Sequence, residues 1–388
     1  MTLEPNAIVE TLATILTGRA GLHEPEFAGN EWEYVKDCLD TGWVSTAGKY
    51  VETFEEKLVA FTGAKHAIAC VNGTAALHAC FLLAGVKAGD EVIMPALTFV
   101  GTANAAAGMG AVPHFVDVEE RTLGLDAAKL DAHLSDVAEV TDDGLRNRKT
   151  GRRIAACVPV HTFGHPVDLD PLLAVCRKFE LVLIEDAAES LGSYYNNRHT
   201  GNHGLLAMLS FNGNKTVTTG GGGAILTNDS EVAARARHLT TTAKMAHPWE
   251  YRHDQIGFNY RLPNINAALG CAQMEQLPRF LKQKRRLAQT YAEAFADVEG
   301  LRFFTEPDFA KSNYWLNVLL LDPQTAGQRD AILEATNDSK FMTRPAWTPL
   351  HDLPMYKDCP RMDLSVAEGL ITRIINIPSS PGLAVAND

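Results

Sequence analysis

Short apolar segments alternate with amphipathic helical segments between Lys65 and Asp186, and this alternation limits the folds open to the chain. Strands separated by helices need crossover connections, which align the strands in parallel and place helices on both faces of one sheet. The predicted strands and helices are, in order, 66–71, 74–83, 91–95, 101–107, 112–117, 127–134, 154–161, 169–179 and 181–186. A sheet of this kind binds its ligands at the carboxyl ends of its strands.

The rest of the chain predicts three regions. Strands at 207–212 and 223–227 enclose Lys215, and a long helix follows Pro263 as far as about residue 298. Beyond it come isolated strands at 301–305 and 315–321, a helix at 328–335 and a terminal helix at 366–375. We therefore expect an N-terminal helical extension over 1–25, a large α/β cofactor-binding domain over 26–270, and a connecting helix with a smaller α+β domain over 271–388.

Composition excludes several classes of protein. The chain of 388 residues is 46% hydrophobic and carries a net charge of −12, which argues against nucleic acid as a partner. Its seven cysteines form no C-x-x-C pair, which favours a reducing cytoplasm over a disulfide framework. No apolar run is long enough to span a bilayer. We expect a cytoplasmic enzyme without a membrane partner or a metal site.

The most informative segment is Ser210-Phe-Asn-Gly-Asn-Lys215-Thr-Val-Thr-Thr, followed by the glycines Gly220–Gly223. Lys215 precedes the glycines, so the spacing does not match a nucleotide P-loop. Asp186 ends an apolar strand, where a carboxylate needs a partner such as a pyridinium; a helix N-cap would explain it equally well. Glu189 lies one helical turn further on. An amine and an acid in this order fit pyridoxal 5′-phosphate, whose aldehyde forms a Schiff base with lysine.

Other residues are candidate cofactor ligands. Gly73 and Thr74 open a helix directly after a strand, and free amide groups at such a position favour a phosphate; a simple capped turn explains the motif as well. Ser210 and Asn212 end the strand before Lys215. Phe99 follows another strand end, where an aromatic ring can stack on a flat cofactor, although such a ring is often core.

As a set, these motifs resemble the DegT-type nucleotide-sugar aminotransferases, which are fold-type I pyridoxal-phosphate enzymes. The resemblance runs from about His23 to Pro378. It is carried by the segments Gly42-Trp-Val-Ser, Asn72-Gly-Thr-Ala-Ala-Leu, Pro95-Ala-Leu-Thr-Phe-Val, Val160-His-Thr-Phe-Gly-His-Pro-Val-Asp, Glu185-Asp-Ala-Ala-Glu-Ser, Ser210-Phe-Asn-Gly-Asn-Lys and Gly257-Phe-Asn-Tyr-Arg-Leu. It implies a mostly parallel, seven-stranded type of sheet between helices.

The resemblance also implies roles for the residues. Lys215 would bond to the cofactor aldehyde and Asp186 would pair with the pyridine nitrogen. Gly73, Thr74 and Ser210 would hold the phosphate, and Phe99 would stack on the ring. Asn259 would reach the phosphate from the neighbouring subunit of an obligatory homodimer. Many family members have Gln in place of Glu189, and Gly220–Gly223 replaces a more usual Gly-Glu-Gly-Gly.

Within the family, the run Asn212–Thr219 and the N-terminal extension look most like enzymes of bacillosamine and legionaminic acid synthesis. Those enzymes use L-glutamate to aminate C4 of a UDP-linked 2-acetamido-4-keto-2,6-dideoxyhexose. The alternative is the perosamine synthase branch, which aminates GDP-4-keto-6-deoxymannose. A sugar dehydratase of the same fold is a further alternative, but such members replace the lysine with histidine. His161 and His351 are candidate sugar contacts, with a core or surface position as the alternative for each.

Overall fold

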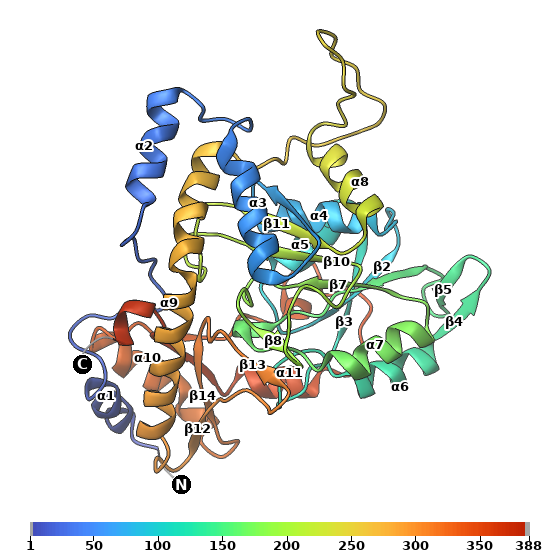
Figure 1. Ribbon diagram of the computed structural model, residues 1–388. Helices are drawn as coiled ribbons and strands as arrows, with labels where there is room; N and C mark the ends of the chain where they lie inside the picture. Colours follow the sequence, from blue (N-terminus) through green and yellow to red (C-terminus); the bar gives the residue numbers. More distant parts are fainter. Residues whose placement is uncertain (1–2, 385–388) are drawn as a thin grey trace.

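The computed structural model describes residues 3–384, in which a large α/β domain joins a smaller lobe (Figure 1). The helices of the described chain are α1 (Pro5–Ala13), α2 (Glu31–Thr41), α3 (Lys49–Thr62), α4 (Gly73–Leu83), α5 (Gly101–Ala107), α6 (Ala127–Val137), α7 (Leu169–Lys178), α8 (Ser230–Thr240), α9 (Asn264–Ala294), α10 (Arg329–Asp338) and α11 (Ser365–Ile371). Short 3₁₀ turns are η1 (Thr162–Gly164), η2 (Ala326–Gln328), η3 (Leu350–Asp352) and η4 (Pro381–Ala384). None of these helices combines the length and apolar character that a membrane span needs.

The central sheet has seven strands in the order β1-β11-β10-β7-β6-β2-β3. Only β11 runs antiparallel to its neighbours, so the sheet is mostly parallel, as predicted. The strands are β1 (His66–Cys70), β2 (Glu91–Pro95), β3 (Val112–Val116), β6 (Ile154–Cys157), β7 (Val182–Asp186), β10 (Leu206–Ser210) and β11 (Gly223–Thr227).

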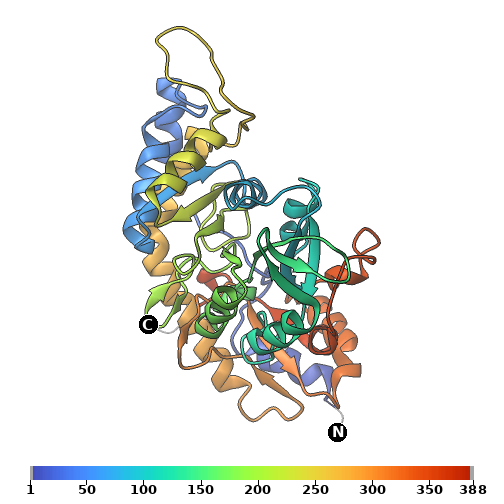
Figure 2. The ribbon, with the colours of Figure 1, turned by 90° about the vertical axis from the view of Figure 1, so that its right-hand side faces the viewer.

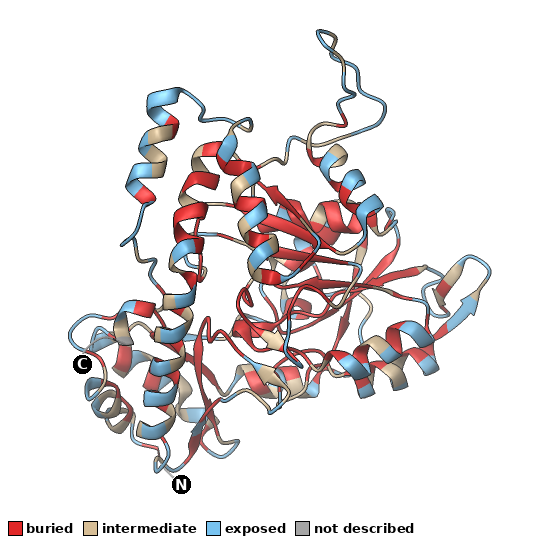
Figure 3. Cartoon of the chain, in the orientation of Figure 1, coloured by how far each residue is buried: buried red, intermediate tan, exposed pale blue. Residues whose placement is uncertain are grey.

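Helices cover both faces of this sheet, because alternate residues of each strand point to opposite sides. On β10, Met208 packs with the residues of α4, α5 and α8, whereas Leu209 packs with those of α3 and α9. Ile93 of β2 faces the side covered by α6 and α7. Apart from one end residue in each of β1, β3, β7 and β10, the strands are buried, and they appear as a red layer in Figure 3. The predicted fold class is confirmed.

The smaller lobe is built on a four-stranded sheet in the order β12-β14-β16-β15, whose paired strands are antiparallel. Its strands are β12 (Leu301–Phe303), β14 (Asn317–Leu321), β15 (Arg344–Pro345) and β16 (Ile374–Ile377). The N-terminal helix α1 does not stand apart: Ile8 and Leu12 are fully buried in one cluster with Tyr291 of α9 and Ile332 of α10. The extension is therefore part of the core of the small lobe.

Two predicted features differ from the structure. The terminal helix predicted at 366–375 ends at Ile371, and β16 begins three residues later. The predicted domain boundary at 270/271 falls inside α9, which runs between both lobes. The pattern also missed short strands: the hairpin β4 (Ala138–Thr141) and β5 (Gly144–Asn147), and the sheet of β8 (Tyr194–Tyr195), β9 (Arg198–His199) and β13 (Ala310–Lys311).

Two segments extend beyond the body of the molecule. One is α2, and the other is the loop between α8 and α9, residues 241–263, which we call the arm (Figures 1 and 2). Both are largely exposed (Figure 3). Large apolar side chains nevertheless lie on them, including Trp32 of α2 and Trp249, Tyr251 and Ile256 of the arm.

Candidate active site

A cavity of about 360 Å³ opens where the parallel strands of the large domain end. Its lining combines residues of β7 and β10, residues of the loops and helices next to the other strand ends, and two tryptophans of the small lobe. Every cofactor-site residue predicted within one chain lines it: Gly73, Thr74, Phe99, Asp186, Glu189, Ser210, Asn212 and Lys215. The topology thus brings these predicted residues together, although Gly73 and Lys215 are 142 positions apart in the sequence.

Asp186 ends β7 and presents its carboxylate to the cavity from a buried position. Its Oδ2 accepts a hydrogen bond of 2.7 Å from the hydroxyl of Thr102, and its Oδ1 accepts one from the amide of Ala188. Burial raises the pKa of Asp186, while the two hydrogen bonds and the nearby charge of Lys215 act against this rise. No cation of the described chain forms an ion pair with it, so this carboxylate fits a cationic group of a ligand.

Opposite Asp186, the N-terminus of α4 forms a narrow cradle. Asn72 caps the helix by accepting a hydrogen bond from the amide of Ala75, and the amides of Gly73 and Thr74 remain outside the helical ladder. A Cβ atom on Gly73 would lie 3.1 Å from the Cβ of Ser210. A Cβ on Gly223 would lie only 2.6 Å from the backbone of Asn72, so this position requires glycine. The cradle fits a phosphate group.

Lys215 enters the cavity from the loop between β10 and β11. Its Nζ lies 3.1 Å from Oε1 of Glu189 and 3.7 Å from the centre of the Trp315 ring. Glu189 is held in turn, because its Oε2 accepts a hydrogen bond of 2.8 Å from the amide of Phe163. Burial raises the pKa of Glu189, whereas the charge of Lys215 lowers it. Glu189 is therefore the ion-pair partner of the lysine.

Phe163 stands out by its backbone. Its φ of 57° is in the left-handed region, which a bulky residue seldom adopts and which concentrates at functional sites. This conformation directs its amide to Glu189 and lets its ring stack on Trp347 at 4.9 Å between ring centres. Trp347 also contacts the edge of Phe99, with 6.4 Å between ring centres. The small lobe thus contributes an aromatic wall to the cavity.

The sequence motifs do not point to several lining residues, among them Thr102, Trp315 and Trp347. Thr102 lies three positions after Phe99, in the first turn of α5, and this proximity was the one available signal. Trp315 lies in a run predicted as a strand, and Trp347 lies in a loop. Neither tryptophan has a local motif, since the docking of the small lobe alone brings them to the cavity.

The structure does not bring His161 into the cavity. Its side chain is fully buried, with Nε2 at 3.1 Å from Oε2 of Glu185. Its Nδ1 accepts a hydrogen bond from the amide of Val167, so the ring proton is on Nε2 and is donated to Glu185. Both ring nitrogens are occupied, which leaves no group for a sugar. His161 therefore supports the end of β7 through its hydrogen bond to Glu185.

His351 and Asn259 also lie outside this cavity. His351 belongs to η3, is 7% exposed, and its Nε2 lies 3.0 Å from Oε1 of Glu368 of α11. We therefore assign neither predicted histidine to the sugar. Asn259 is exposed on the arm, where its backbone bridges to Thr241. Within one chain it does not contribute to the lining.

An amine, an unpaired buried carboxylate and a phosphate-sized cradle around one cavity, at the carboxyl edge of this sheet, define a fold-type I pyridoxal-phosphate enzyme. The comparisons with known proteins narrow this class. A model of the DegT/DnrJ/EryC1/StrS aminotransferase family matches residues 25–387, and the chain belongs to that family. It is a pyridoxal-phosphate-dependent sugar aminotransferase, as the resemblance implied.

Individual relatives align over nearly their whole length. The chain is 37% identical to the GDP-perosamine synthase of Caulobacter vibrioides, over 95% of each chain. It is 35% identical to the GDP-perosamine synthase of Escherichia coli O157:H7, over 94% of each. Among solved structures, the aminotransferase TlmJ from Streptoalloteichus hindustanus superimposes with a TM-score of 0.84 at 28% identity, over 93% of this chain and 94% of that one.

Proposed function

We propose that the protein transfers the amino group of L-glutamate to C4 of GDP-4-keto-6-deoxymannose. The observation that carries the choice of sugar is the similarity to two GDP-perosamine synthases over at least 94% of the chain. The sequence motifs favour a UDP-linked 2-acetamido-4-keto-2,6-dideoxyhexose, with the GDP-linked sugar as the alternative. The relatives support the alternative better, and the UDP-linked sugar remains a competitor in the test below.

The chemistry assigns one task to each cavity residue. Bound pyridoxal phosphate supplies an aldehyde that exchanges amines and a ring that accepts electrons. Lys215 would bond to the aldehyde carbon at rest. Once displaced, its amine would remove the proton from Cα of glutamate in the first half-reaction, which releases 2-oxoglutarate, and would deliver a proton to C4 of the sugar in the second. Asp186 keeps the ring nitrogen protonated, because a buried carboxylate without another cation stabilises a positive charge beside it.

The remaining residues position the cofactor. The amides of Gly73 and Thr74 and the hydroxyl of Ser210 bind the phosphate, Asn212 borders the lysine loop, and Phe99 packs on the ring face. We propose that the cavity holds the cofactor and the reacting part of the sugar, and that the nucleotide extends across its rim, where a neighbouring subunit would contribute.

We further propose that the active form is a homodimer that shares its sites. The arm exposes 78% of Trp249, 81% of Tyr251 and 84% of Ile256, and Trp32 of α2 is 81% exposed. Apolar patches of this kind mark surfaces that another protein covers. Asn259 lies at the base of the arm, eight residues after Tyr251 and three after Ile256. A second copy that packs against the arm would receive Asn259 at its phosphate cradle.

A substrate panel tests the proposal. Purified protein is incubated with ¹⁵N-labelled glutamate and with GDP-, UDP- or dTDP-linked 4-keto-6-deoxy sugars. The amount of ¹⁵N-labelled amino sugar formed from each is measured by mass spectrometry. We expect label in the GDP-linked product, at a rate at least about tenfold above the others, which is the discrimination that one good set of contacts provides. Lys215→Ala is the control and should form none. Preferential labelling of the UDP-linked sugar would overturn the choice of nucleotide while leaving the aminotransferase assignment intact.

A further inference from the structure

The amine of Lys215 has two contacts besides the cavity itself. On one side is the carboxylate of Glu189, at 3.1 Å. On the other is the face of the Trp315 ring, whose centre is 3.7 Å from Nζ. A cation this close to the centre of an indole ring lies well inside the range of the cation–π attraction, and tryptophan is the strongest side chain for it.

The Trp315 ring is held in place by its own polar contacts. Its indole nitrogen donates a hydrogen bond of 2.7 Å to the carbonyl of Asn214, the residue directly before Lys215. Its backbone amide donates to Oδ1 of Asn313, and its carbonyl accepts a hydrogen bond of 3.2 Å from the buried Lys284. The side chain is only 4% exposed. A ring fixed from these directions offers a defined surface to the lysine amine.

Lys284 is itself buried inside α9, and Nζ also donates to the carbonyl of Ser379. Burial lowers its pKa well below the ordinary value for lysine. The carbonyl groups of Trp315 and Ser379 accept these two hydrogen bonds from the Lys284 amine. Lys284 therefore joins α9 to the backbone of Trp315 and to the segment after β16.

We propose that Trp315 is a positioning residue that docks the amine of Lys215 whenever that amine is not bonded to the cofactor. The inference rests on the proposed function, because it takes Lys215 as the residue that is displaced and returns in each cycle. Glu189 and Trp315 then hold the freed amine from two sides at the edge of the cavity. The amine stays close to the reacting carbon and does not swing into solvent or obstruct the incoming sugar.

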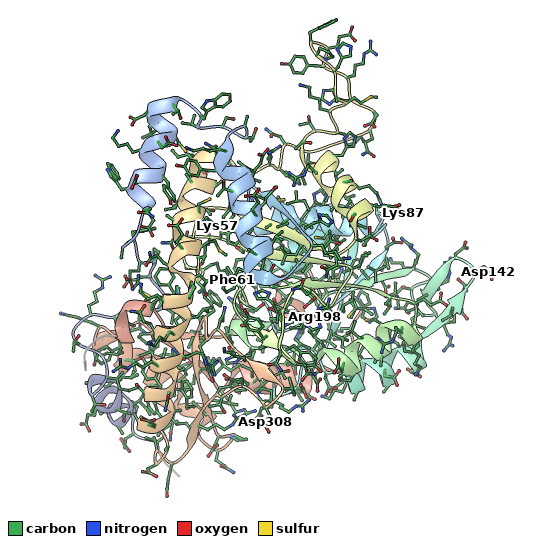
Figure 4. All side chains as sticks on the ribbon, viewed as in Figure 1. Lys57, Phe61, Lys87, Asp142, Arg198 and Asp308 are labelled. Atoms are coloured by element: carbon green, nitrogen blue, oxygen red, sulfur yellow. The ribbon has the colours of Figure 1, made fainter. Side chains whose placement is uncertain are left out.

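Chemical labelling of lysines tests this docking without turnover. The full-length protein is freed of cofactor and treated with an amine-reactive reagent, and the labelling rate at Lys215 is measured by peptide mass spectrometry. Lys87, an exposed residue at the periphery of the large domain, serves as the internal reference (Figure 4). The variants are Trp315→Leu, which removes the aromatic face, and Trp315→Phe, which keeps one. Trp347→Leu is the matched control, since Trp347 lines the same cavity without contact to the lysine amine.

We expect Trp315→Leu to label at Lys215 at least about five times faster than the wild type, because the amine loses one of the two groups that shield and hold it. Trp315→Phe and Trp347→Leu should stay within about twofold. Unchanged labelling in Trp315→Leu would overturn the proposal. Equal acceleration in Trp347→Leu would do the same, because it would indicate general loosening of the cavity.

Two further measurements keep the test independent of folding and of the proposed reaction. If Trp315→Leu fails to fold, Trp315→Phe decides alone: protection of Lys215 equal to that of the wild type supports docking on a ring, and labelling as fast as Lys87 contradicts it. Glutamate added to the loaded wild-type protein should raise the labelling of Lys215 from none to the slow rate of the cofactor-free wild type, because the displaced amine then docks on Trp315 and Glu189. Absence of this effect would contradict the proposed function, whereas the labelling of the cofactor-free variants would still report on docking.

Discussion

At the scale of single residues, two neighbouring carboxylates at the end of β7 show how surroundings set chemistry. Burial by itself would raise the pKa of both. Glu185 accepts hydrogen bonds from His161 and from the amides of Gly201, His203 and Gly204, and its pKa falls to about 2. Asp186 has fewer donors, and its pKa is raised. Glu185 is held by hydrogen bonds from the protein itself, whereas Asp186 has fewer protein donors and fits a cationic group of a ligand.

This contrast leads to a paired mutational prediction. Asp186→Asn should lower kcat by about 100-fold or more, since one preorganised electrostatic group commonly contributes that much, while the melting temperature changes little. Glu185→Gln should do the reverse: it removes a buried acceptor of several hydrogen bonds and should cost about 2–4 kcal/mol of unfolding free energy. Steady-state kinetics and thermal melts of both variants provide the check. Near-normal turnover of Asp186→Asn would contradict its assignment.

The sequence predicted the polar residues of the site better than their supports. Lys215, Asp186 and Ser210 stand at strand ends or between strands, where chain order alone restricts their location. Thr102 acts on Asp186 from another crossover, and Trp315 comes from the small lobe, so tertiary packing decides both. His161 is the last residue of the strand predicted at 154–161, but β6 ends at Cys157 and His161 is fully buried beyond it.

At the scale of elements, the predicted strands of the central sheet match the structure to within two residues at each end, except at 154–161, where β6 already ends at Cys157. The predictions at 91–95 and 223–227 coincide with β2 and β11. The C-terminal segment failed for a physical reason. The apolar spacing of α11 continues into the run Ile374-Ile-Asn-Ile, and only pairing with β14 and β15 turns that run into a strand. Local periodicity carries no information about such partners.

The arm provides the prediction for this scale. Ile256→Glu should shift the protein from dimer towards monomer, because a charge at the centre of an apolar contact is costly to bury. Aminotransfer should fall with it if Asn259 acts across the interface. Val140→Glu is the matched control, since Val140 is an exposed aliphatic residue on the β4–β5 hairpin, near Asp142 at its tip (Figure 4). Sedimentation velocity distinguishes the two species, and an unaltered dimer in Ile256→Glu would exclude the arm from the interface.

At the scale of the whole molecule, several buried histidines make stability depend on pH. Burial lowers the pKa of His133 to about 4, of His165 to about 3 and of His199 to about 4. The unfolded chain binds these protons near pH 6.5, whereas the folded chain binds them only at lower pH. Stability is therefore complete above about pH 6.5 and falls as the pH drops towards 4, because the unfolded state then holds more protons.

His165 offers the sharpest test of this pH dependence. Neither ring nitrogen has a hydrogen-bond partner among the described residues, and the ring packs edge-on against Phe304 and Tyr314. In His165→Phe, the number of protons taken up on unfolding between pH 6 and 4 should fall by about one. The free energy of unfolding should therefore depend less steeply on pH. Urea titrations at pH 7.5, 6 and 5 measure the slope. A variant that keeps the wild-type slope would contradict the assignment of a neutral, buried His165.

The packing of α1 has a consequence for biosynthesis. Ile8 and Leu12 share a cluster with residues of α9, α10 and the small-lobe strands, all more than 270 residues later, and Ala20 bridges to Phe341. At the edge of the large sheet, β1 must likewise wait for β11, which begins about 150 residues after it ends. The first helix thus emerges from the ribosome long before anything can cover its apolar face. Folding of the small lobe must wait until α9, α10 and the strands of its sheet have been synthesised, and the apolar face of α1 is a natural client for a chaperone until then.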